Sequence, residues 1–262
     1  MMGTMNVRLA DPCDQPAAEA MLRAGFGDED WFLRAFFDCV WQRCDMLIST
    51  QEGIPAAMAA LLPCGVYREN AEITPACYLY ALSTLPDFRG RGHAKGLLLA
   101  AQARCECVFL HAESDSLHGW YQSLGWQDAM HAKRITLPAL PGDAPPPADA
   151  DAYYAARERL LRGTAHIVWG KDLCAFAARM LACEGGGFYA ADHAACAVTG
   201  IQDGCLMLCE ALGDLSCAQR LAGALGCKCL SVLTPCAAGD IALAQAVGTP
   251  LPEPLHMGFD FD

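Results

Sequence analysis

The sequence predicts an α/β (α+β) protein built in two halves. Helical and strand-like segments are interleaved along the 262 residues, and a proline-rich segment divides them. The same order of elements (helix, helix, three strands, helix, strand) occurs on both sides of that segment, which predicts a structural repeat. With 54% hydrophobic and 18% charged residues, the chain can bury a sizeable core.

In the first half, residues 16–26 and 28–44 carry apolar side chains at the three- and four-residue spacing of amphipathic helices. Residues 46–50 and 56–62 predict a hairpin, and residues 76–85 predict a longer strand that ends before Pro86. Four further elements are expected: a helix over 95–105, a strand over 107–111, a short helix over 115–123 and a strand pair around 132–137.

The clearest domain boundary is the segment 138–151, with prolines at 138, 141 and 145–147. Proline fixes φ and removes a backbone donor, so an extended, semi-rigid linker is expected here. We therefore predict a first domain over 1–140, a linker over 141–150 and a second domain over 151–262. The second domain has expected helices over 151–162, 173–184 and 216–225, the last capped by Ser216, and expected strands over 188–191, 195–201, 205–212 and 229–233.

Composition narrows the class of protein. A net charge of −12 argues against nucleic-acid binding, which needs a surplus of positive charge. The longest apolar run, 54–66, is interrupted by proline and glycine and is too short to cross a bilayer. The sixteen cysteines lie mostly in apolar stretches, without zinc-finger spacing, and the first residues lack the apolar core of a signal peptide. We expect a reduced, cytoplasmic protein without a metal and without a membrane partner.

One glycine-rich segment has the residues expected of an anion-binding loop. The strand over 76–85 runs into Arg89-Gly90-Arg91-Gly92-His93-Ala94-Lys95 and then into the apolar helix. Glycines let the backbone turn tightly and approach a ligand, and the free amides at a helix start favour an anion such as a pyrophosphate. Arg89, Arg91 and Lys95 add positive charge, whereas His93 is expected to be a side chain that the loop merely tolerates. Alone, this pattern also fits a solvated turn.

A second segment follows one strand later, in which Trp120-Tyr121 precedes Leu124-Gly125-Trp126. With both motifs in this order, residues 5–137 resemble the GCN5-related N-acetyltransferase (GNAT) superfamily. The resemblance implies a mixed, strongly twisted sheet flanked by helices, whose fourth and fifth strands splay apart. The second half is expected to be a smaller, degenerate GNAT-like domain, because residues 212–217 stand where a cofactor loop would be.

The resemblance also implies a cofactor site for acetyl-CoA as co-substrate. Pantetheine would pair with the backbone of Leu82, Ser83, Thr84 and Leu85, and the pyrophosphate would bind the amides of residues 89–95. Ser114 is included among the cofactor contacts, although this family often has Asn seven residues before the tyrosine.

Tyr121 matches the family tyrosine that protonates the leaving thiolate, and a phenol with pKa near 10 keeps its proton at neutral pH. The alternative for Tyr121 is a packing role in the core. Glu113 is the base that we predict. The alternatives are His111, Glu69, Glu72 and the terminal carboxylate of Asp262.

The function predicted from these residues is N-acetyl transfer to a primary amine of a small molecule or peptide, by direct attack on the thioester. The second half is expected to shape the acceptor cleft without binding CoA, and a homodimer is possible. The alternative is a non-catalytic acyl-CoA-binding or regulatory module.

Overall fold

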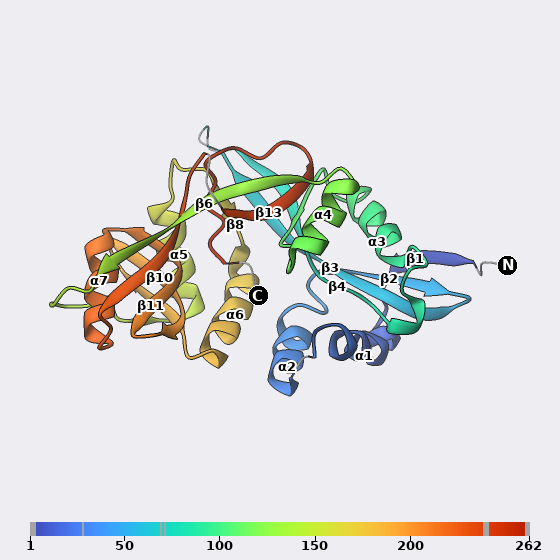
Figure 1. The fold of residues 1–262 in the computed structure, drawn as a ribbon, viewed down its shortest axis with the longest axis horizontal. Coiled ribbons are helices and arrows are strands. Elements are labelled where there is room, and N and C mark those ends of the chain that lie inside the picture. Colours follow the sequence, from blue (N-terminus) through green and yellow to red (C-terminus); the bar gives the residue numbers. More distant parts are fainter. Residues whose placement is uncertain (1–3, 28, 69, 71, 238–240, 260–262) are drawn as a thin grey trace. The chain divides into compact units, whose positions relative to one another are not determined.

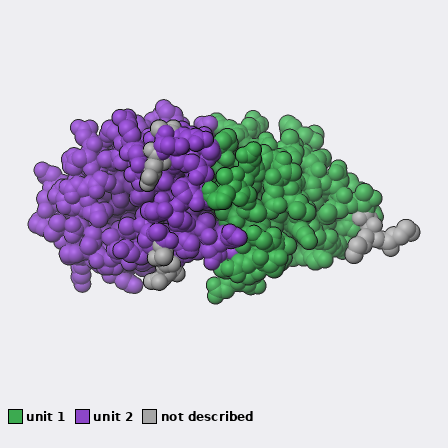
Figure 2. All heavy atoms as spheres, turned by 90° about the horizontal axis from the view of Figure 1, so that it is seen from above, with its two compact units in different colours: residues 1–64, 75–126, 246–250 green, residues 65–74, 127–245, 251–262 purple. Residues whose placement is uncertain are grey.

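The computed structural model describes residues 4–27, 29–68, 70, 72–237 and 241–259. They form two compact units, shown in different colours in Figure 2. Unit 1 comprises residues 1–64, 75–126 and 246–250, and unit 2 comprises residues 65–74, 127–245 and 251–262. The predicted linker at 141–150 lies inside unit 2. The division into a first domain over 1–140 and a second over 151–262 stays a prediction.

The sheet of unit 1 has the strand order β1-β2-β3-β4-β5-β13. Neighbours β1 to β3 pair antiparallel, whereas β4 and β5 pair in parallel. The strands are β1 (Met5–Leu9), β2 (Asp45–Gln51), β3 (Ile54–Tyr67), β4 (Ile73–Thr84), β5 (Cys107–Leu110) and β13 (Ile241–Gly248). Figure 1 labels all of these except β5.

Among its described residues, four α-helices and two short 3-10 turns complete unit 1. They are η1 (Pro12–Asp14), α1 (Gln15–Phe26), α2 (Asp30–Cys39), η2 (Pro86–Phe88), α3 (His93–Gln102) and α4 (Asp115–Ser123). Helix α2 packs on β4 through Phe36 and Tyr80, whose ring centroids lie 6.4 Å apart. On a separate cluster, Leu97 of α3 packs with Leu79 of β4 and Val108 of β5. Alternate residues of the strands thus supply two cores, one on each face.

The sheet of unit 2 has the order β13-β6-β12-β11-β10-β9-β7, in which β11 and β12 pair in parallel. Its strands are β6 (Gln127–Pro138), β7 (Pro147–Ala148), β9 (Gly187–Ala191), β10 (Ala194–Gln202), β11 (Cys205–Gly213) and β12 (Cys229–Pro235). A further strand, β8 (His166–Val168), pairs with the end of β3 at residues 65–67. The helices are α5 (Ala150–Leu160), α6 (Gly170–Cys183) and α7 (Leu215–Ala224).

The predicted repeat is present in the element order. Helices α1 and α2, strands β2 to β4, helix α3 and strand β5 correspond in order to α5, α6, β9 to β11, α7 and β12. In the first half β4 pairs in parallel with β5, the strand that follows α3. In the second half β11 pairs in parallel with β12, the strand that follows α7. The predicted α/β fold class, with a GNAT-like second half, is confirmed.

Several details differ from the sequence prediction. Helix α2 ends at Cys39 rather than at residue 44, because the chain turns at Val40. The strand pair expected around 132–137 is the single strand β6, whose partner is β12. Asp214, not Ser216, caps α7, since its carboxylate accepts the amide of Ser216 at 2.9 Å.

All sixteen cysteines lie within the described residues, and none of them forms a disulfide. Within the described residues, no helix combines the length and the apolar character needed to cross a membrane. The described residues also hold no cluster of three or more His, Cys, Asp or Glu side chains suited to a metal ion.

Candidate active site

The candidate site in unit 1 begins where β4 continues beyond the end of its neighbour β5. The two strands pair at Cys77 with Val108 and at Tyr78 with Phe109, and β4 then continues to Thr84 while β5 ends at Leu110. Ala81 has a φ of 53°, in the left-handed region, so the extended backbone of β4 is interrupted there. A break of this kind changes the direction of the strand. It lies directly before residues 82–85, the segment predicted to hold pantetheine.

The four predicted pantetheine residues differ in how they are held. Leu82 packs against the core cluster of unit 1. Ser83 is buried, and its hydroxyl donates to the carbonyl of Met21 at 2.9 Å. The Thr84 carbonyl accepts from Nε of Arg89 at 3.1 Å, and the Leu85 amide donates to the carbonyl of Ala56 at 2.9 Å. These contacts fix the end of β4 on both sides.

The glycine loop that follows gives α3 an open start. Gly90 and Gly92 have φ values of 74° and 90°, a conformation that L side chains rarely adopt. Gly92 is the N-cap residue of α3 and supplies no side chain to the first amides of the helix. Those of His93, Ala94 and Lys95 precede the first intrahelical bond, from the Gly96 amide to the Gly92 carbonyl. Together with the helix dipole they form an arrangement suited to a pyrophosphate.

The charged side chains of the loop lie at its surface. Arg89, Arg91 and Lys95 are exposed. The Arg91 guanidinium lies 5.5 Å from the ring centroid of Phe88, and its Nη1 donates to the side-chain oxygen of Gln51 at 3.2 Å. Fixed cations beside free amides strengthen the preference of the loop for an anion.

His93 has a structural role that the sequence did not predict. Its side chain is 2% exposed rather than solvated, with Nδ1 2.8 Å from the hydroxyl of Ser49 and Nε2 3.3 Å from the oxygen of Gln51. Burial, and secondarily the charge of Arg91, lowers the pKa of His93. The neutral imidazole therefore ties the start of α3 to the end of β2. The only sequence signal was the polar pair Ser49 and Thr50 at the end of an apolar strand.

Tyr121 lies on α4 between two indole rings. Its ring centroid is 5.0 Å from that of Trp120 and 5.8 Å from that of Trp126. Tyr121 is 5% exposed, and burial raises its pKa to about 12. It belongs to the same buried cluster as Leu110, with Leu82 packed against that cluster, so the structure brings α4 to the ends of β5 and β4.

The remaining predicted residues lie between β5 and α4 or elsewhere. Ser114 is the N-cap of α4, where its hydroxyl oxygen accepts the amide of Leu117 at 3.3 Å. Glu113 is exposed and His111 is half-buried. Glu72 is also exposed, and the side-chain amide of Asn70 donates to it at 3.3 Å. Glu69 and Asp262 lie outside the described residues.

The comparisons with known proteins agree with this geometry. Residues 6–129 match the family model described as an acetyltransferase (GNAT) domain, which spans both motifs. The first part of the chain is a GNAT domain. The chain thus carries an acyltransferase domain, with acyl-CoA-dependent acetyl transfer implied by the family.

Solved structures share the fold over nearly the whole chain. A probable N-acyltransferase from Enterococcus faecalis V583 is 12% identical with a TM-score of 0.72, over 94% of this chain and 73% of that one. A GCN5-related N-acetyltransferase from Kribbella flavida is 16% identical with a TM-score of 0.66, over 94% and 72%. A third, from Anabaena variabilis, is 12% identical with a TM-score of 0.67, over 93% and 72%. At such identities the likeness concerns the fold, and no curated protein matches the sequence.

Proposed function

We propose that the chain is an acetyl-CoA-dependent N-acetyltransferase acting on a primary amine of a small molecule or peptide. The observation that carries this proposal is the juxtaposition, in one unit, of the open start of α3 at Gly92 and a buried Tyr121 that shares a cluster with Leu110. The first feature suits a pyrophosphate and the second supplies a protonated hydroxyl, which are two requirements of transfer from a CoA thioester.

Acetyl-CoA would be held by residues of unit 1 alone. The amides after Gly92 and the exposed Arg91 suit the pyrophosphate. For the amides of pantetheine we propose the backbone of residues 82–85, within which the Leu85 amide already donates to Ala56 and the Thr84 carbonyl accepts from Arg89. Ser114 accepts a backbone amide through its oxygen, which leaves its hydroxyl hydrogen available to the cofactor.

In the proposed reaction the neutral amine attacks the thioester carbonyl carbon. A C–N bond forms, the C–S bond breaks, and Tyr121 donates its proton to the departing thiolate. The amine nitrogen loses a proton to a base, for which we propose the exposed Glu113. His111 and Glu72 are the described alternatives. Comparing Glu113→Gln with His111→Gln should show which variant loses kcat while retaining KM for acetyl-CoA.

Thiol release from acetyl-CoA with a panel of primary amines tests the proposal. Acceptor-dependent release of CoA is expected. Acetyl-CoA binding without any acceptor-dependent release would instead favour the non-catalytic binding module. The oligomeric state, for which a homodimer is one option, can be measured in the same preparation by light scattering.

A glycine pair provides the matched control for the cofactor loop. Gly92→Val should abolish acetyl-CoA binding by calorimetry, because a β-branched side chain strains the turn and fills the space over the amides. Gly53→Val imposes a similar strain at a φ of 82° in the β2–β3 turn, with no atom within 4 Å of the new Cβ, and should bind acetyl-CoA normally. Equal affinity in both variants, with both folded, would exclude the loop as the pyrophosphate site.

A further inference from the structure

Unit 2 contains a gap in its own sheet. Strands β11 and β12 pair in parallel from Cys205 with Cys229 to Leu208 with Val232. Beyond that point β11 follows β10 as far as Gly213, while β12 follows β6 as far as Pro235. The two strands therefore separate, and residues 210–213 of β11 and 233–235 of β12 lie beyond their shared ladder. Alternate backbone amides and carbonyls of these edges point toward the gap.

A β-bulge in β11 changes which side chains face each helix. Ala197 lies opposite Glu210 and Val198 lies opposite Leu208, so Cys209 is an extra residue. Leu208 packs in the cluster with α7, whereas Glu210 contacts α5. Without the bulge, both side chains would point to the same face. The bulge thus directs a carboxylate to the side of the gap that faces α5.

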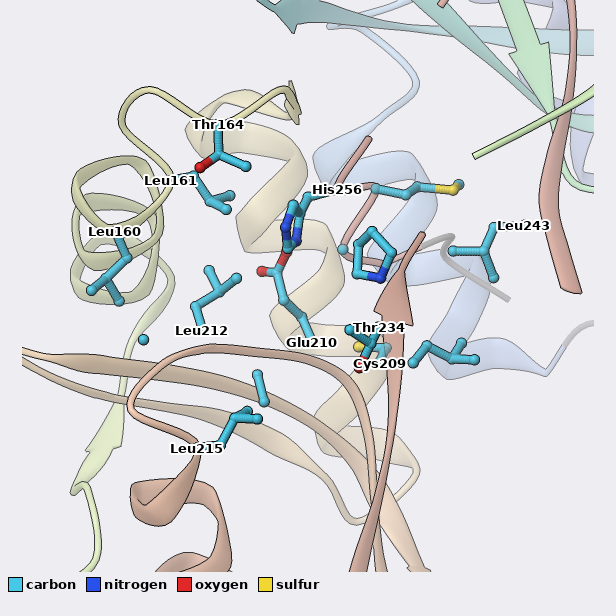
Figure 3. Close-up of a pocket in the computed structure, with 16 residues that line it drawn as sticks. Leu160, Leu161, Thr164, Cys209, Glu210, Leu212, Leu215, Thr234, Leu243 and His256 are labelled. Carbon is cyan, nitrogen blue, oxygen red and sulfur yellow. The ribbon is translucent and has the colours of Figure 1, made fainter. Parts of the chain in front are cut away.

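The gap opens into a cavity of about 280 Å³ (Figure 3), close to the lower end of the range for ligand pockets. Its walls come from α5 and the residues after it, from β11, β12, the start of α7 and β13, and from the segment 256–258, all within unit 2. Most of the wall is apolar and is formed by Leu160, Leu161, Leu212, Leu215, Leu233 and Leu243. Thr164, Thr234, Glu210 and His256 add polar groups.

The charges at this cavity are already balanced. Glu210 is 3% exposed and accepts from Nε and Nη2 of Arg157 at 2.9 and 3.2 Å, and from the hydroxyl of Tyr153 at 2.5 Å. Burial lowers the pKa of His256, which Glu210 partly opposes, so its imidazole is neutral near pH 7. A charged ligand would bring an unpaired charge into an apolar space.

The start of α7 also differs from a phosphate site. Asp214 occupies the N-cap position, where its carboxylate accepts the amide and the hydroxyl of Ser216 at 2.9 and 2.7 Å. An anion would meet a carboxylate here rather than open amides.

We infer that this cavity binds a neutral, mainly apolar molecule with a carboxamide group. The aliphatic part would contact the leucine walls, and the amide would pair with the open backbone edges of β11 and β12 or with the imidazole of His256. The binding site belongs to unit 2 and does not depend on acetyl transfer by unit 1.

Hexanamide is a suitable probe, followed by NMR of methyl-labelled methionines in the full chain. Met257 lines the cavity and Met207 of β11 does not. The methyl signal of Met257 therefore reports binding in the cavity, and that of Met207 reports changes outside it. Hexanamide should shift Met257 saturably in the millimolar range and leave Met207 unchanged. Hexyl phosphate, with the same chain and a charged head, should bind about tenfold more weakly or worse.

Two half-buried threonines give the matched variants. Thr234→Phe fills the cavity and should abolish the shift of Met257, while Thr199→Phe, on β10 outside the cavity, should preserve it. If Thr234→Phe does not fold, Leu243→Trp fills the cavity from a second strand. An unmoved Met257 in the wild type, an equal shift in a folded filling variant, or equal binding of hexyl phosphate would each overturn the inference.

Discussion

At the scale of single residues, the chemistry of the candidate site depends on burial. Tyr121 carries no charged partner in the described structure, and its pKa is raised to about 12 by removal from water. A phenol with a pKa of about 12 is almost fully protonated near neutral pH. Tyr121 can therefore act as an acid, and no neighbouring group is needed to keep its hydroxyl protonated.

Tyr121→Phe should lower kcat about 100-fold with little change in the affinity for acetyl-CoA, the usual scale for losing one general acid. The ring, with its packing on Trp120 and Trp126, is retained in this variant. In the wild type, the pH profile of kcat should show no decline from loss of this proton up to about pH 10, because the folded pKa lies well above that. Unchanged turnover in the variant would assign Tyr121 to the core alone.

His93 should make stability depend on pH. Its folded pKa lies below the ordinary value of 6.5, so the folded state disfavours the protonated imidazole. The stabilisation is complete above pH 6.5 and is lost as the pH falls through the folded pKa. His93→Gln removes this titration, so the difference in Tm between wild type and variant should shrink from pH 7.5 to pH 5.5. A constant difference across that range would contradict the buried, neutral role.

At the scale of elements, the order of helices and strands was predictable because each has its own local signal. The helices show three- and four-residue apolar spacing, and the long strand β4 ends where Pro86 breaks it. The strands that escaped prediction have weak signals. β1 is exposed along most of its length. In β13 three of the eight residues are alanine and only two are β-branched, so the neighbours in the sheet define both strands.

The candidate site was predictable as motifs but not as contacts. Arg89 to Lys95 and Tyr121 stood out because glycines and a tyrosine occur at a characteristic spacing. The bond between His93 and Ser49 joins residues 44 positions apart, and no local pattern reveals such a pair. The same holds for Glu210, whose partners Tyr153 and Arg157 lie more than 50 residues away along the chain.

The buried ion pair between Arg157 of α5 and Glu210 of β11 should affect the free energy of unfolding. Arg157→Met leaves the Glu210 carboxylate buried without its cation, and we expect a loss of about 3–5 kcal/mol in urea unfolding. The double variant Arg157→Met, Glu210→Leu should lose less than the single one, because no uncompensated charge remains. Lys171→Met removes an exposed pair with Asp151 and should have no measurable effect. Equal losses in the Arg157 and Lys171 variants would contradict this account.

At the scale of the whole molecule, sequence order and spatial order differ. The chain completes most of unit 1, builds unit 2, and then supplies the edge strand of unit 1 from residues 246–250. Val247 packs against the core of unit 1, and the Thr249 amide donates to the carbonyl of Glu106 at 2.8 Å. Gly248 approaches so closely that an added Cβ would lie 1.9 Å from that same carbonyl. Unit 1 is therefore not a contiguous piece of sequence.

A chain that ends at Leu140 should accordingly be insoluble or inactive, although it holds both motifs. It lacks β13, so the edge of β5 is bare, and its strand β6 loses the partner that pairs with residues 132–138. Unpaired edges of this kind favour aggregation. The matched control is the full chain with a protease site inserted between Pro141 and Gly142, in an exposed segment. After cleavage, β6 and β12 still hold the two pieces together, and thiol release from acetyl-CoA should persist. A soluble, monomeric and fully active 1–140 fragment would show that β13 and the rest of residues 141–262 are dispensable to the acetyltransferase domain.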